Sequence, residues 1–162
     1  MKTFKNILIL GASCLFFSAC YNLRDPLINK DASLETYEYV IIPETKELTS
    51  GSGALYGGDY TYAAMSNKSV NPGDVIEGIL MKKGYKSLDS IRPEFIDQTL
   101  IIKYGESGRR SVGLGGYTIE VTIYFYDAKT YKTIFSCTAE GIGSTEADDI
   151  REAIERCLSG LD

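Results

Sequence analysis

The sequence predicts an α+β domain with two layers: a mostly antiparallel sheet of about four to five strands, and two helices packed on one face. Two segments, 71–84 and 145–161, repeat apolar residues at the helical period of 3.6. Other runs alternate apolar and polar residues as strands do, most clearly 119–125 and 131–139. The 162-residue chain is 44% hydrophobic and 24% charged, which suits one core of ordinary size.

The first elements surround a glycine-rich stretch. Residues 37–42 form a β-rich run that Pro43 ends. Residues 49–62 are rich in Gly, Ser and Tyr, which predicts a mobile loop or an irregular hairpin. This stretch contains three tyrosines that form either a recognition surface or partly buried loop packing, namely Tyr56, Tyr60 and Tyr62.

The first helix has clear end signals. Asn71 is the expected N-cap, Pro72 suits the first helical position, and Gly84 is expected just after the last turn. A short strand at 85–88 should follow. Residues 99–104 then form a β-rich strand that is expected to end at Gly105.

The strands 119–125 and 131–139 are expected to pair as a hairpin with its turn at residues 127–130. Pairing Phe125 with Tyr131 places Val121 opposite Phe135, so the apolar faces coincide, and we expect this register. It places Glu140 more than about 10 Å from Glu120, too far for a catalytic carboxylate pair.

The last helix is expected to start at Thr145, which forms a capping box with Asp148. Its apolar face should pack on the sheet, and Asp149 is expected to face water. Asp148 and Asp149 lie in the first turn, where negative charge stabilises the helix dipole. A divalent-metal role for them lacks a set of further ligands.

Composition excludes several kinds of chemistry. The chain has no histidine, so a Ser-His-Asp triad, a Cys-His pair and an imidazole metal ligand are absent. The net charge of −5, with no basic tract, argues against nucleic-acid binding. The glycines at 51–53 and 113–116 lack the spacing of a phosphate-binding loop. We therefore expect no catalytic residue, no metal and no cofactor.

The amino terminus has the three parts of a secretion signal. Lys2 and Lys5 precede the apolar run 7–19, which is too short to span a bilayer as a helix. Small residues directly before Cys20 resemble a lipobox, the site of lipoprotein signal peptidase, with Phe17 where a leucine is usual. The alternative is a buried cysteine in an amino-terminal helix.

The lipobox divides the chain into a signal peptide (1–19), a lipidated tether (20–33) and a single α+β domain (34–162). Cleavage removes Lys2 and Lys5 and leaves a net charge of −7. Resemblance to bacterial lipoproteins implies three acyl chains on Cys20, palmitate included, and such chains anchor a protein stably. Tyr21 follows, and the lack of an Asp there favours the outer membrane. We expect the protein to face the periplasm, with the cell surface as the alternative.

Two pairs of residues are candidates for further roles. Arg109 and Arg110, flanked by glycines on an expected flexible loop, could bind phosphate, a carboxylate or a partner's acid, or they form a solvated turn. Cys137 and Cys157 point to apolar faces of elements that should pack together. Two buried free thiols are the favoured interpretation, and a disulfide is the alternative.

The order of these elements resembles an uncharacterised family of periplasmic lipoproteins of Gram-negative bacteria that contain a domain of unknown function. The resemblance rests on Cys20, the helix at 71–84, the turn at 127–130, and Glu140 before the final helix. It covers most of residues 34–161 and implies no catalytic residues. We expect a non-enzymatic membrane-anchored lipoprotein that binds an envelope protein or has a structural role. The alternative is a small-ligand binder or weak hydrolase that uses Arg109 and Arg110.

Overall fold

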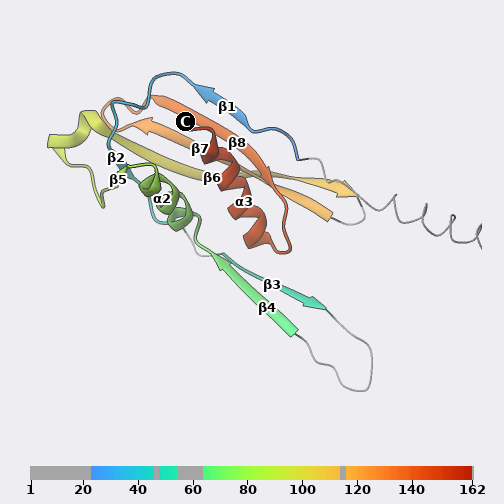
Figure 1. Ribbon diagram of the computed structural model, residues 1–162. Coiled ribbons are helices and arrows are strands. Elements are labelled where there is room, and N and C mark those ends of the chain that lie inside the picture. Colours follow the sequence, from blue (N-terminus) through green and yellow to red (C-terminus); the bar gives the residue numbers. More distant parts are fainter. Residues whose placement is uncertain (1–22, 46–47, 55–63, 114–115, 162) are drawn as a thin grey trace, which may run out of the picture.

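The computed structural model describes residues 23–45, 48–54, 64–113 and 116–161, and it is built on a six-stranded sheet of order β1-β8-β7-β6-β2-β5 (Figure 1). The strands are β1 (Leu27–Lys30), β2 (Tyr39–Ile41), β5 (Lys86–Ser87), β6 (Thr99–Gly113), β7 (Gly116–Asp127) and β8 (Thr133–Gly141). The neighbouring pairs β1–β8, β8–β7 and β7–β6 are antiparallel, whereas β2 is parallel to both β6 and β5. The predicted α+β class is therefore confirmed.

Two helices lie on the same side of the sheet in Figure 1, α2 (Pro72–Lys82) and α3 (Glu146–Ser159). The predicted helix starts are confirmed, because the side chain of Asn71 accepts a hydrogen bond from the Gly73 N–H and that of Thr145 accepts one from the Asp148 N–H. Helix α3 packs on β7 and β8 and contacts α2. The core between the layers contains fully buried side chains from both helices and the central strands, including Ile76, Leu80, Ile123, Phe125, Phe135, Ile150, Ile154 and Leu158.

The predicted register of the β7–β8 hairpin is wrong. Phe125 pairs with Phe135, and Val121 pairs with Ala139. Both registers keep the apolar faces together, because they differ by an even number of positions, so alternation alone does not distinguish them. The connection decides between them. Asp127 accepts hydrogen bonds from both the backbone N–H and the hydroxyl of Thr130, and Tyr131 takes a φ of 57°, so β8 begins only at Thr133.

Strand β6 is much longer than the expected strand at 99–104. It continues through Gly105 to Gly113 and pairs with β7 along its length, with irregularities between Glu106 and Gly108 and between Ser111 and Gly113. Residues 108–113 therefore belong to a strand and not to the flexible loop that the glycines predicted. Glycine inside a strand often marks a bulge, and the two irregularities end at Gly108 and Gly113.

The sheet also has a strand that the sequence did not indicate. Residues 27–30, which lie in the predicted tether, form the edge strand β1 and pair with β8. All four residues of β1 are exposed, so the segment carries no apolar alternation that would have marked it as a strand. This strand raises the count above the predicted four to five.

The first part of the glycine-rich stretch after β2 forms a strand with a regular register, and residues 55–62 of the predicted loop or irregular hairpin lie outside the described residues. Strands β3 (Leu48–Ala54) and β4 (Ala64–Val70) pair antiparallel as a separate two-stranded sheet, which projects from the body in Figure 1. The tyrosines considered as a recognition surface, Tyr56, Tyr60 and Tyr62, lie outside the described residues.

Candidate functional site

The most tightly connected group of charged residues surrounds Glu140 near the end of β8. Along β8, Phe135, Cys137 and Ala139 face the helices, so the alternation directs Glu140 to the opposite face. Glu140 is nevertheless buried, with 3% of its side chain exposed. A carboxylate in this position needs charged or hydrogen-bonding partners, because burial of an unpaired charge is costly.

Arg110 is the main partner of Glu140. Its Nε donates to Oε1 at 2.7 Å and its Nη2 donates to Oε2 at 2.6 Å, which is the bidentate geometry of a strong ion pair. Arg110 belongs to β6 and reaches Glu140 of β8 across the intervening strand, where its cross-strand partner Thr118 is completely buried. The pair thus connects two strands that are not neighbours.

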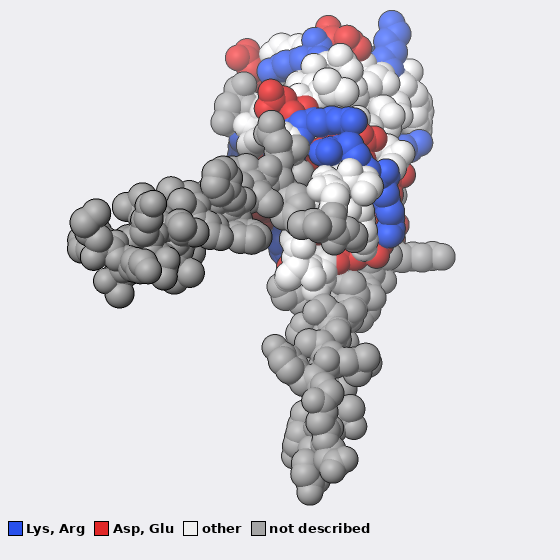
Figure 2. All heavy atoms as spheres, turned by 90° about the vertical axis from the view of Figure 1, so that its right-hand side faces the viewer, with Lys and Arg blue, Asp and Glu red and all other residues white. Residues whose placement is uncertain are grey.

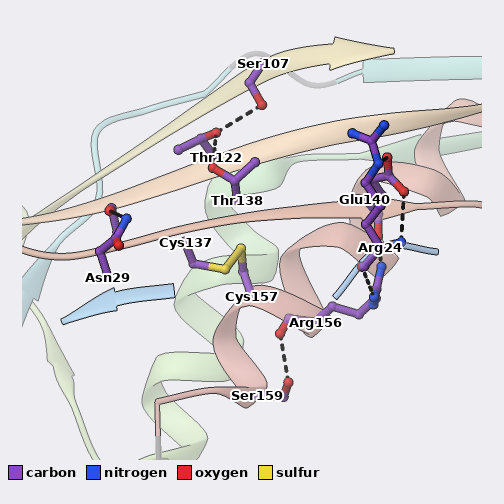
Figure 3. Close-up of a disulfide and its surroundings, with 11 residues drawn as sticks. Arg24, Asn29, Ser107, Thr122, Cys137, Thr138, Glu140, Arg156, Cys157 and Ser159 are labelled. Carbon is purple, nitrogen blue, oxygen red and sulfur yellow. Dashed lines mark hydrogen bonds and ion pairs between the residues drawn. A yellow bond between two sulfur atoms is a disulfide. The ribbon is translucent and has the colours of Figure 1, made fainter. Parts of the chain in front are cut away.

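Arg24 and Arg156 complete this group. The backbone N–H of Arg24 donates to Glu140 Oε2 at 3.1 Å, and the Arg24 Nε lies 3.7 Å from Oε1. From helix α3, Arg156 donates through Nη1 to the Glu140 carbonyl at 2.5 Å and through Nη2 to the Arg24 carbonyl at 2.6 Å. Figure 3 shows Arg24, Glu140 and Arg156 converging. We call Arg24, Arg110, Glu140 and Arg156 the Glu140 latch.

The electrostatics of the latch determine what it can do chemically. Hydrogen bonding from Arg110 lowers the pKa of Glu140 to about 2, although burial acts in the opposite direction. Glu140 is therefore ionised at neutral pH, and its oxygens accept hydrogen bonds from Arg110 and Arg24. A general acid or base works best with a pKa near the working pH, so this geometry suits holding the chain in place better than proton transfer.

Arg109 and Arg110 are separated by the strand that carries them. Arg109 points to the helix side, where its Nη2 donates to Glu146 Oε1 at 2.6 Å and its guanidinium lies 5.2 Å from the centre of the Tyr117 ring. Tyr117 and Glu146 line a cleft of about 420 Å³ at the start of α3, and neither arginine is among its lining residues. The structure thus directs the two guanidinium groups to different acids.

Glu120 lies much closer to Glu140 than the predicted register implied, because the two are direct cross-strand partners. The distance argument against a catalytic pair is therefore wrong. Their partners give a different argument: Glu120 accepts a hydrogen bond from the Ser107 hydroxyl at 2.9 Å, whereas Glu140 binds Arg110. These contacts engage the two carboxylates with different side chains.

The structure joins Cys137 of β8 to Cys157 of α3 as a disulfide, with the Cα atoms 5.5 Å apart (Figure 3). This is the alternative to the two free thiols that were favoured. Both cysteines are buried, at 1% and 0% exposure, and they belong to the two elements that pack most closely across the layers. Their Cα separation lies in the normal range for a disulfide.

Asp149 differs from its predicted position, because it is buried and does not face water. The Gly143 N–H donates to its carboxylate, and burial raises the pKa of Asp149. The connection from β8 to α3 is very close here: a Cβ on Gly141 would lie 1.8 Å from the Asp149 carbonyl oxygen. The glycines at 141 and 143 were the signal in the sequence for this close approach.

Three other findings bear on function. The described residues contain no group of three or more Asp, Glu, Cys or His side chains that could hold a metal ion. None of the helices in the described part of the chain has the length and apolar character needed to cross a membrane. Cys20, the predicted lipidation residue, lies outside the described residues.

No model of a known protein family matches this chain, and no curated protein matches it significantly. The resemblance to periplasmic lipoproteins therefore stays a prediction from the sequence.

Proposed function

We propose that this protein is a lipoprotein of the bacterial envelope, anchored to the outer membrane by acyl chains on Cys20 and facing the periplasm, with the cell surface as the alternative location. The observation that carries the proposal is the amino-terminal pattern: two lysines, an apolar run of 13 residues that is too short to cross a bilayer, and small residues directly before Cys20. The resemblance to the uncharacterised periplasmic lipoprotein family belongs to the same proposal.

The disulfide geometry supports an exported location. Disulfides persist in oxidising compartments such as the periplasm and are rare in the cytosol. The Cα atoms of Cys137 and Cys157 are at a distance that accommodates a bridge without backbone movement. An exported chain with this pair would therefore become oxidised, and the bridge would fix α3 to the sheet.

We further propose that the body binds an envelope protein or has a structural role, and that it is not an enzyme. The support comes from the charged groups that the fold brings together. Arg110 and Glu140 form a bidentate pair, and Arg109 is engaged by Glu146. These arginines would have to leave their carboxylates to hold a phosphate or a substrate acid, which disfavours the alternative of a ligand binder or weak hydrolase built on them.

Chemical crosslinking in native membranes tests this role, with wild type compared with Cys20→Ala. We expect wild type to be recovered from the outer-membrane fraction with a small set of envelope components, and Cys20→Ala, which keeps its signal peptide, to lose the outer membrane and these crosslinks. Substrate turnover by the purified protein that Arg110→Gln abolishes would contradict the non-enzymatic role and favour the alternative.

A further inference from the structure

The far end of the β6–β7 hairpin extends beyond the rest of the sheet. The last pair between β7 and β8 is Ile119 with Gly141, whereas β7 continues to pair with β6 as far as Gly116. On its other side, β6 pairs with β2 only through residues 99–101. The described residues 110–113 and 116–118 thus form a two-stranded tip, at the right-hand end of the sheet in Figure 1.

The tip has the chemistry of a membrane interface. No residue from 111 to 119 is charged, and Tyr117 is 39% exposed. Arg109, at the base of the tip, stacks its guanidinium on the Tyr117 ring, and half of the Arg109 side chain is exposed. Tyrosine concentrates at the boundary between bilayer and water, so an exposed Tyr117 beside an uncharged segment suits the headgroup layer.

The chain enters the body at the same end of the sheet. Arg24 is held on Glu140, and Glu140 binds Arg110 at the base of the tip. Arg24 is only four positions after Cys20, and a fully extended chain over four steps spans at most about 14 Å. Figure 2 views this end of the molecule and shows Lys and Arg side chains in a band across it. A bilayer that holds Cys20 must therefore lie close to the tip.

We propose that the tip, residues 110–113 and 116–118, rests in the headgroup layer of the phospholipid bilayer that anchors Cys20. This inference rests on the proposed lipidation. By holding Arg24, the Glu140 latch keeps the chain between Cys20 and the body short, and it fixes which end of the sheet faces the membrane. The turn between β7 and β8 then points away from the bilayer, because Tyr117 and Tyr126 are nine residues apart on β7, or about 30 Å. That distal end is left available to partners.

The absence of tryptophan from the chain allows a clean test. Tyr117→Trp places a single fluorophore at the tip, and Tyr131→Trp places one at the opposite end, where Tyr131 is 65% exposed. The full lipidated protein, extracted from membranes, is reconstituted into phosphatidylethanolamine and phosphatidylglycerol vesicles with and without bromine on the acyl chains. We expect bromine to quench the Trp at position 117 and its emission to be blue-shifted, while the Trp at position 131 keeps the emission it has in unbrominated vesicles.

The latch is tested in the Tyr117→Trp background. Glu140→Gln removes the ion pair. It is expected to reduce quenching of the fluorophore, because release of Arg24 lengthens the chain between Cys20 and its first attachment to the body. Glu120→Gln is the matched control, since Glu120 is the cross-strand partner of Glu140 but is not part of the latch. We expect the control to leave quenching unchanged, and circular dichroism verifies that both variants fold. Equal quenching in both variants would overturn the role of the latch.

The outcomes separate the two proposals. A protein that floats with the vesicles, but whose fluorophore at position 117 is not quenched or is quenched no more than that at position 131, overturns the docking of the tip and leaves the anchor intact. A protein that does not float with the vesicles overturns the anchor, and the docking with it.

Discussion

Glu140 is the residue whose replacement should lower stability most within the latch. Glu140→Gln keeps the shape of the side chain but removes the charge that Arg110 pairs with. Glu140 is buried, but 30% of the Arg110 side chain is exposed, so water partly replaces the lost partner of Arg110. Because hydrogen bonds to a charged group contribute more than neutral ones, we expect the free energy of unfolding, measured by urea denaturation at neutral pH, to fall by more than about 1 kcal/mol. Glu120→Gln should change it by less than about 0.5 kcal/mol, and equal losses in the two variants would contradict this account of the latch.

The same carboxylate predicts how stability depends on pH. Its pKa is about 2 in the folded protein, below the ordinary value of 4.5, so the folded state prefers the ionised form. The stabilisation is complete above the ordinary value and is lost as the pH falls towards 2. The difference in unfolding free energy between wild type and Glu140→Gln should therefore shrink between neutral pH and about pH 3. A difference that stays constant over this range would show that ionisation of Glu140 does not stabilise the fold.

Single residues also show what the sequence could and could not reveal. Asn71 and Thr145 were identified as N-caps because capping depends on residues close in sequence. The latch was not identified, because Arg24, Arg110 and Glu140 are far apart in sequence and meet only through the order of the strands. Arg109 and Arg110 were recognised as candidates, but their placement in a strand and their acidic partners required the fold.

At the scale of an element, helix α2 offers a local test. Asn71→Ala removes the side-chain oxygen that accepts the Gly73 N–H at 3.0 Å. Loss of an N-cap costs about 1 kcal/mol, so thermal or urea unfolding should show a decrease of that size. Asn71→Asp should retain most of the stability, because aspartate caps a helix as well as asparagine does. A variant Asn71→Ala that is as stable as wild type would show that α2 does not depend on this cap.

The attachment of α3 to β8 depends on the bridge between Cys137 and Cys157, which are 20 residues apart. Closing a loop of that size stabilises a protein by about 3 kcal/mol in the chain-entropy model. The double variant Cys137→Ala with Cys157→Ala should lower the unfolding free energy by a similar amount. In the unreduced, denatured wild type, alkylation followed by peptide mass spectrometry should label neither cysteine, and it should label both after reduction. Rapid labelling of both without reductant would refute the bridge.

Elements also differed in how well they could be predicted. Both helices and the central strands follow from local periodicity, which survives in the structure. The register of β7 and β8 did not follow, because alternation fixes the face of a strand and not its offset by an even number of positions, and the six residues 127–132 set that offset. Strand β1 has no alternation at all, so only pairing with β8 reveals it.

In the whole molecule, the segment after Cys20 is attached to the body as early as Arg24. The sequence indicated a tether of residues 20–33, but Arg24 is held by the latch and 27–30 pair with the sheet. Arg24 is only four positions after Cys20, so lipidation of Cys20 would hold the body against the membrane. The proposed orientation, with the hairpin tip at the bilayer, depends on the fold and could not be inferred from the sequence alone.

Our proposal requires above all that Cys20 is the first residue of the mature protein and carries its lipid. The most direct measurement is the mass of the amino-terminal peptide from protein extracted from the membranes of a Gram-negative host. We predict a peptide that begins at Cys20 and carries the added mass of three acyl chains, while Cys20→Ala remains an unlipidated precursor beginning at Met1. A wild-type peptide that begins at any other residue, or at an unmodified Cys20, would contradict the claim.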